Sequence, residues 1–161
     1  MKRLINLFAL LVATAVVAGT LMAQTKMPSF AGTWKLNVAK SKYEGTQAPK
    51  SLTRTVTAEG QGLKYSFEGE AGDGSKISYG FTTNLDGKDS AITGVGMPAG
   101  ADAVALERPS AHHITGVLKH DGAKIGTVTT AISPDGQTVT VSSKVKMDGK
   151  EVKTEQVYEK Q

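Results

Sequence analysis

Apolar and polar side chains alternate along most of the chain beyond residue 29. Leu63, Tyr65 and Phe67 are separated by polar residues, and the same period of two recurs in residues 76–84 and 138–147. This period is typical of β-strands with one buried and one solvent-facing side, and no segment of this region has the helical period. The pattern predicts an all-β domain with ten strands, at residues 30–38, 51–59, 63–69, 76–84, 88–93, 101–108, 112–120, 123–133, 138–147 and 151–159.

Turn sequences rich in Asp and Gly separate these predicted strands. Glycine adopts the positive φ that tight hairpin turns require, and Asp-Gly is a strong hairpin signal. The candidate turns are Gly60-Gln61-Gly62, Gly72-Asp73-Gly74, Asp86-Gly87, Asp121-Gly122, Pro134-Asp135-Gly136 and Asp148-Gly149. We therefore expect an antiparallel up-and-down β-barrel of about eight to ten strands, because closure removes exposed sheet edges. A two-sheet β-sandwich has the same alternation and is the alternative.

The first 23 residues have the composition of a signal peptide. Lys2 and Arg3 are followed by an apolar segment from Leu4 to Ala18, and Leu21-Met22-Ala23 ends in a small residue suited to cleavage. A membrane anchor is the alternative for this apolar segment, but the small residues before the cleavage site favour removal. We expect export to the periplasm or the medium, with residues 24–161 forming a single β-barrel domain.

Composition narrows the function classes. The chain has no cysteine, so the exported domain has neither a disulfide nor a lipid-modified cysteine, and its hydrophobic core must stabilise it alone. Loss of two basic residues with the signal peptide lowers the net charge from +4 to +2. Basic residues are scattered and aromatic residues are few, a composition that disfavours nucleic-acid binding. We expect a soluble monomer without a cofactor or a nucleic-acid partner.

The first predicted strand opens with the only tryptophan of the chain, Trp34, in the sequence Phe30-Ala31-Gly32-Thr33-Trp34-Lys35-Leu36. This Gly-X-Trp frame resembles the start of the barrel in calycins, the superfamily of lipocalins and fatty-acid-binding proteins. The resemblance implies that Trp34 plugs the barrel floor and that Gly32 lets the chain pass close behind it. The mature chain most resembles secreted bacterial lipocalin-like proteins of uncharacterised function, which implies a fold rather than an activity. The other segments that carry this resemblance are Lys40-Ser41-Lys42-Tyr43 and Pro49-Lys50-Ser51-Leu52-Thr53.

The last predicted strand ends in Gln156-Val157-Tyr158-Glu159-Lys160, which resembles the closing strand of fatty-acid-binding proteins. In that family the corresponding Arg or Gln and the Tyr bind the polar head of the ligand. The resemblance assigns this role to Gln156 and Tyr158, and alternation places both on the same face as Val152. Residues 39–50 are too few for the two-helix lid of that family and are expected to form an open loop.

Two hypotheses of function follow. In the first, the barrel holds a small hydrophobic or amphipathic ligand in its interior. Its cavity would be lined by residues that share the apolar face of their strands: Leu63, Tyr65, Phe67, Ile77, Tyr79, Phe81 and Met147. In the second, these side chains fill the interior and the protein acts through its outer surface, as a structural or interaction protein of the envelope.

Two arginines share the parity of apolar neighbours and are candidates for binding a ligand carboxylate. Arg54 lies between Leu52 and Val56, and Arg108 follows another apolar run. An arginine at such a position can also pack its apolar stem on the sheet and place its guanidinium in solvent. Both orientations stay open for Arg54, whereas Arg108, next to Pro109 at a strand end, is expected at the rim.

No motif indicates catalysis or a metal site. Among the three histidines, His112, His113 and His120, the first and last stand about 26 Å apart along one strand, too far to share a metal ion. No serine lies in a Gly-X-Ser-X-Gly frame, and a cysteine nucleophile is missing. The glycine-rich segment 94–100 lacks the Lys-Ser/Thr of a phosphate loop and is expected at the rim of the barrel mouth. We expect a binding protein without catalytic or metal-ligating residues.

Overall fold

The computed structural model describes residues 29–147 and 149–161, which form twelve β-strands and two short 3-10 helices. The strands are β1 (Gly32–Leu36), β2 (Lys42–Glu44), β3 (Ser51–Glu59), β4 (Gly62–Glu70), β5 (Lys76–Thr83), β6 (Asp86–Ala91), β7 (Thr93–Val95), β8 (Ala103–Ser110), β9 (His113–His120), β10 (Ala123–Ile132), β11 (Thr138–Met147) and β12 (Lys150–Lys160). The 3-10 helices are η1 (Val38–Lys40) and η2 (Pro98–Gly100). Among the described residues, therefore, no helix has the length and apolar composition that crossing a membrane requires. The expected signal peptide, residues 1–23, and residues 24–28 lie outside the described residues.

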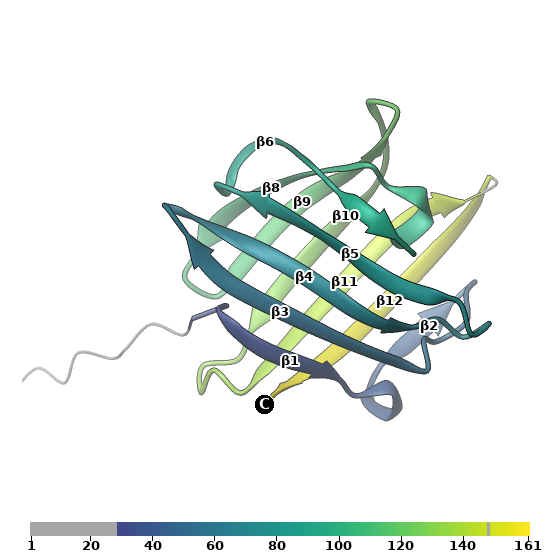
Figure 1. Ribbon diagram of the computed structural model, residues 1–161, viewed down its shortest axis with the longest axis horizontal. Coiled ribbons are helices and arrows are strands. Elements are labelled where there is room, and N and C mark those ends of the chain that lie inside the picture. The colour runs from purple at the N-terminus through teal and green to yellow at the C-terminus, as the bar shows by residue number, and fades with distance from the viewer. Residues whose placement is uncertain (1–28, 148) are drawn as a thin grey trace, which may run out of the picture.

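One antiparallel sheet curves into a barrel (Figure 1). The strand order is β6-β8-β9-β10-β11-β12-β1-β3-β4-β5-β7, and β2 adds to β12. β1 lies between β12 and β3: Trp34 is opposite Lys160 on β12 and opposite Arg54 on β3. The expected up-and-down barrel is confirmed, and the two-sheet sandwich is not the architecture of this chain.

All ten predicted strands are present, and β3 and β11 have the predicted bounds. The two further strands of the described sheet, β2 and β7, have three residues each, too few for alternation to reveal them. β2 lies within residues 39–50, which were expected to form an open loop. It is a strand because Tyr43 pairs with Thr154 on β12, and a partner so distant in sequence leaves no local signal.

The barrel closes through a segment that changes its partner strand. β6 pairs with β8, whereas β7 pairs with β5 on the opposite side of the seam. The change falls at Ile92, which lies between β6 and β7 and whose side chain is buried. The described strands β5 and β6 follow each other in the chain but are not neighbours in the sheet. The cylinder is therefore nearly closed, with β5 and β6 separated along part of their length.

The predicted hairpin turn at Asp86-Gly87 is wrong. The chain reverses between β5 and β6 at Leu85, which has a φ of 57°. Gly87 lies inside β6, where the pairing with β8 shifts register between Asp86 and Asp89. Its φ of 76° fits this β-bulge, because a bulge and a tight turn both favour a glycine with positive φ. The same residue pair can therefore indicate either structure.

Side chains fill one end of the barrel, which we call the packed end. It is formed by residues that are at most 2% exposed: Phe30, Trp34, Val56, Ile114 and Val139. The indole Nε1 of Trp34 donates a hydrogen bond of 3.0 Å to the carbonyl oxygen of Phe30. Gly32 has a φ of 145°, and a Cβ there would lie 3.3 Å from Lys160 Cε and 3.6 Å from Trp34 Nε1. Glycine at this position lets the backbone pass close to the Trp34 ring.

The opposite end of the barrel is the open end. It is formed by residues 45–50, 71–75 and 96–102, which connect strands at that end. Met147, the last residue of β11, is 41% exposed there. Side chains fill the packed end, whereas the interior near the open end is not filled, so the candidate site lies toward the open end.

Candidate functional site

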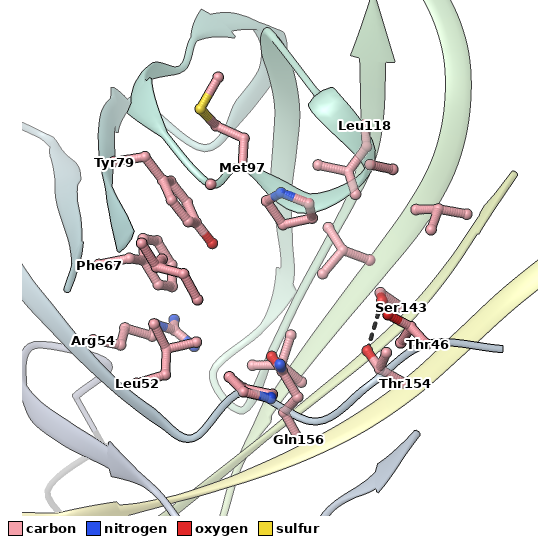
Figure 2. A pocket seen from close by; sticks show the side chains of 18 of the residues that line it. Thr46, Leu52, Arg54, Phe67, Tyr79, Met97, Leu118, Ser143, Thr154 and Gln156 are labelled. Atoms are coloured by element: carbon pink, nitrogen blue, oxygen red, sulfur yellow. Dashed lines mark hydrogen bonds between the residues drawn. The ribbon is translucent and has the colours of Figure 1, made fainter. Parts of the chain in front are cut away.

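A cavity of about 320 Å³ occupies the barrel interior and extends to the open end (Figure 2). Its volume lies at the lower end of the range of roughly 300–1,000 Å³ found for small-molecule sites. Apolar and aromatic side chains dominate its wall. Among the described residues that line it, Arg54 is the only one with a charged side chain. This combination is typical of sites for small amphipathic molecules.

The predicted ligand-binding residues meet in this cavity. The eight that line it are Arg54, Tyr65, Phe67, Tyr79, Phe81, Met147, Gln156 and Tyr158. Ile77 lines it too, whereas Leu63 is half-buried against the core and is not among the lining residues. Gly32 and Trp34, predicted to form the floor, lie at the packed end and do not line the cavity. Of the expected rim segment 94–100, Gly96, Met97, Pro98 and Ala99 face the cavity.

The register of the sheet brings residues from four strands into one row. Trp34 on β1 lies opposite Arg54 on β3, Arg54 lies opposite Phe67 on β4, and Phe67 lies opposite Tyr79 on β5. Residues that are opposite each other in a sheet share a face and touch. Arg54 is therefore set between the indole of the packed end and the aromatic side chains of the cavity.

Four aromatic rings form a stack on β4 and β5. Ring centroids are 4.5 Å apart for Phe67 and Tyr79 and 4.7 Å apart for Tyr65 and Phe81, with interplanar angles of 16° and 20°. These are cross-strand pairs, in which stacking adds to the burial of apolar surface. The stack gives the cavity one aromatic side.

Arg54 is a buried charge without a counter-charge. The residue is 2% exposed, and its Cζ lies 5.0 Å from the centroid of the Tyr65 ring. Its Nε atom and the Tyr65 hydroxyl are buried without a hydrogen-bond partner among the described residues, and no ion pair of Arg54 occurs among them either. A buried charge normally has a paired acceptor, because removing it from water is costly. The guanidinium is therefore the group in this cavity that is best suited to bind an anion.

Burial raises the pKa of the tyrosines around Arg54. For Tyr65, Tyr79 and Tyr158, desolvation inside the barrel is the main cause, and the nearby positive charge of Arg54 opposes it. All three phenols are therefore neutral at physiological pH and can donate hydrogen bonds. None of them supplies a negative charge to Arg54.

The two residues assigned to head-group binding are hydrogen-bonded to each other. The Tyr158 hydroxyl donates to Gln156 Oε1 at 3.0 Å, and Gln156 Nε2 donates to the Tyr43 hydroxyl at 3.5 Å. Tyr43 belongs to β2, so this chain of bonds connects the interior of β12 to the strand that alternation did not reveal. Arg54, rather than Gln156 or Tyr158, has the unsatisfied polar group.

Arg108 lies outside the cavity. Its guanidinium donates to the carbonyl oxygens of Ser110 and Ala111 and lies over the Phe30 ring, with Cζ 5.2 Å from the centroid. The pairing of β8 with β9 shifts register between Glu107 and Ser110, which interrupts the alternation next to Arg108. Arg54 lies in a regular ladder and faces inward, so the two arginines differ although their sequence patterns are alike.

The polar residues on the wall formed by β11 and β12 were not identified from the sequence as site residues. Ser143 and Thr154 line the cavity, and their hydroxyl oxygens are 2.8 Å apart. Ser143 shares the parity of Val141 and Val145, so alternation could have identified it. Tyr43 also lines the cavity, but its position follows from the pairing of β2 with β12.

Among the residues that the structure describes, one group of possible metal ligands lies at the surface. Ligand atoms of Asp102, His120 and Asp121 all fall within 4.8 Å of one another. The backbone N–H of Asp121 donates to Asp102 Oδ2 at 2.7 Å, and His120 Nδ1 is 3.4 Å from the same oxygen. These contacts hold the turn between β9 and β10. Sequence spacing did not reveal the group because Asp102 precedes β8 and reaches the turn through the sheet.

Comparison with known proteins identifies the fold. No protein-family model matches the sequence, and no curated protein matches it. Nineteen chains of solved structures do match. One is zebrafish ileal bile acid-binding protein in complex with cholic acid, with a TM-score of 0.51, 15% identity, and coverage of 82% of this chain and 98% of that chain. Another is the siderocalin Ex-FABP, with a TM-score of 0.36, 14% identity, and coverage of 81% of this chain and 73% of that chain. The first match shows that this chain shares the β-barrel fold of that bile acid-binding protein.

Proposed function

We propose that this protein is an exported, non-catalytic carrier that binds a small amphipathic ligand inside its barrel, with the anionic group of the ligand at Arg54. The observation that carries this proposal is the buried guanidinium, the only charge on the described wall of an otherwise uncharged cavity. An anionic ligand would satisfy it, and the apolar part of the ligand would pack on the aromatic stack. Gln156 and Tyr158 contribute secondary contacts near the same group.

The alternative, a barrel filled by its own side chains, agrees less well with the interior. A filled barrel would have no reason to retain a buried cation with an unpaired Nε. The cavity of about 320 Å³ is also far larger than the packing defects of an ordinary core.

Two dyes that differ mainly in charge would test the proposal. Anilinonaphthalene sulfonate is an anionic amphipathic dye, and N-phenylnaphthylamine is its uncharged counterpart. The delipidated protein should bind both with enhanced fluorescence. Arg54→Met should weaken binding of the sulfonate by roughly 10- to 150-fold, the range for loss of a hydrogen bond to a charged group, and should change binding of the neutral dye much less.

The chain offers a matched control in its other described arginine. Arg108→Met removes an equal charge outside the cavity, so it should leave both affinities unchanged within about twofold. Absence of sulfonate binding to the native protein, or equal losses in both arginine variants, would contradict the proposal.

Native mass spectrometry of protein purified from the bacterial envelope should reveal an adduct that carries an acidic group.

A further inference from the structure

We propose that the ligand is an oxygenated carboxylic acid, with a hydroxyl or carbonyl group far from its carboxylate. This inference rests on the proposed function and adds a second polar contact to it. The observation is a pair of hydroxyl groups, Ser143 on β11 and Thr154 on β12. Figure 2 shows the pair on one side of the cavity, with Arg54 and Phe67 on the other.

The hydroxyl pair can form further hydrogen bonds. Ser143 and Thr154 lie opposite each other in the β11–β12 ladder, and their oxygens are 2.8 Å apart. One hydroxyl donates to the other, so the second hydrogen and several lone pairs stay available. The pair is half-buried in a wall that includes Val141 and Val145, where unsatisfied hydroxyls are unfavourable. Thr130, 6% exposed, places a third hydroxyl on this wall.

The register fixes the distance between the two polar contacts. Arg54 lies opposite Trp34, and Tyr158 lies opposite Leu36, the next inward residue of β1. Tyr158 therefore lies one inward position nearer the open end than Arg54, and the Arg54 charge is close enough to the Tyr158 hydroxyl to act on its pKa. Thr154 is four residues nearer the open end than Tyr158, a separation of about 13 Å along an extended strand. A ligand with its carboxylate at Arg54 would reach the hydroxyl pair with an oxygen a comparable distance away.

A plain fatty acid would use this wall poorly. Its methylene groups would cover the hydroxyls of Ser143 and Thr154 and separate them from water without replacing the lost hydrogen bonds. An oxygen at the matching position would donate to or accept from the pair. The cavity should therefore tolerate a ligand hydroxyl that an entirely apolar wall would reject.

A matched pair of acids isolates this contact. Decanoate and ω-hydroxydecanoate differ by one hydroxyl, whose distance from the carboxylate in the extended chain is close to the separation along β12. Calorimetric titration of the delipidated full-length mature protein should show that the hydroxy acid binds at least as tightly as decanoate. In Ser143→Ala/Thr154→Val, the ratio of the two affinities should shift toward decanoate by about fivefold or more.

Ser142→Ala is the matched control, because Ser142 is the neighbouring residue on the exposed face of β11. It should leave the affinity ratio unchanged. The double variant should fold, since replacing both bonded hydroxyls by groups of similar shape is nearly neutral, and the near-ultraviolet circular dichroism of Trp34 would verify this. The single variant Ser143→Ala should shift the ratio in the same direction by a smaller factor.

The two proposals fail in different ways. If both acids bind through Arg54 but the double variant keeps the native affinity ratio, the hydroxyl contact is overturned and the anion site stands. If the native protein strongly prefers decanoate, the hydroxyl contact is likewise overturned. If neither acid binds the native protein, both proposals fall. A shifted ratio that Ser142→Ala does not reproduce supports the oxygenated ligand.

Discussion

Trp34 and Arg54 are neighbours in the sheet, yet Trp34 belongs to the packed end and Arg54 belongs to the cavity. They lie opposite each other on β1 and β3, and both are almost completely buried. The Trp34 indole has its hydrogen-bond acceptor in Phe30, whereas the Arg54 guanidinium has an Nε without a partner among the described residues. At the packed end, the buried indole N–H is hydrogen-bonded, as is usual in a protein core. In the cavity, a buried charged group has a polar atom without a hydrogen-bond partner among the described residues.

This contrast separates stability from binding within a single cross-strand row. At the packed end, burial and satisfied hydrogen bonds favour the folded chain without any ligand. In the cavity, the same depth of burial makes an unpaired charge unfavourable until an anion arrives. Substitutions on the two sides of this boundary should therefore have opposite effects on the stability of the unliganded protein.

The largest effect should come from the packed end. Trp34→Ala should lower the free energy of unfolding by about 3–5 kcal/mol, because it removes a fully buried ring and leaves a cavity. Urea denaturation followed by far-ultraviolet circular dichroism would measure the loss without relying on tryptophan fluorescence. Trp34→Phe, which keeps part of the ring, should lose less. A loss below about 1 kcal/mol for the alanine variant would mean that this end is not a stabilising core.

The opposite sign is expected across the boundary. Arg54→Met should raise the stability of the delipidated protein by about 1–3 kcal/mol, because it replaces an uncompensated buried charge with an apolar side chain of similar length. The same urea experiment at neutral pH would measure the gain. Arg108→Met should produce no gain, since Arg108 is exposed and bonded to backbone carbonyls. Destabilisation of Arg54→Met to the degree of Trp34→Ala would make Arg54 a structural residue.

Alkaline pH should weaken the barrel through the tyrosines of the cavity. Burial raises the pKa of Tyr79 and Tyr158 above the ordinary tyrosine value of 10.0. Above that pH the unfolded chain loses these protons while the folded chain keeps them, so unfolding is favoured. Each residue should remove about 1.4 kcal/mol of stability per pH unit until its folded pKa is reached. Stability at pH 9 should therefore match that at neutral pH with respect to these groups.

Urea midpoints measured between pH 9 and 11 would test this dependence. Tyr79→Phe and Tyr158→Phe should each flatten the decline, and tyrosinate absorbance should appear together with unfolding rather than before it. Tyr43→Phe should flatten it less, because Tyr43 is only half-buried on β2. A decline that none of these substitutions alters would locate the alkaline sensitivity elsewhere.

Alternation predicted the strands well because one buried face imposes a period of two wherever a ladder is long and regular. The bounds of β3 and β11 follow from this period alone. Three features have no such signal. β2 depends on its pairing with residues 153–155. Closure and the seam between β5 and β6 both depend on the change of partner at Ile92. The described β2 and the seam thus arise from separate long-range pairings.

The site was predictable where parity and ladder regularity coincide. Tyr65, Phe67 and Tyr79 face the cavity as their alternation indicated, and Arg54, for which both orientations were open, faces it too. Arg108 had the same parity, but a register shift beside it redirected the chain. The unpaired state of Arg54 was beyond sequence analysis, because it depends on which side chains from other strands come near, and none of the described ones is acidic.

The smallest effect should come from the rim of the packed end, where Lys160 adds an electrostatic contact to apolar packing. Lys160 Nζ lies 5.4 Å from the centroid of the Trp34 ring, and the two residues are opposite each other on β12 and β1. An exposed cation over an aromatic ring contributes about 0.5–1 kcal/mol, so Lys160→Met should cost roughly that amount while keeping the apolar stem. Lys35→Met, on the outer face of β1, is the control.

If the contact is a cation–π interaction, the cost of Lys160→Met should shrink in a Trp34→Phe background, because phenylalanine attracts cations less strongly than tryptophan. An equal cost in both backgrounds would assign the effect of Lys160 to packing, and the packed end would then owe its stability to apolar burial and to the hydrogen bond from Trp34.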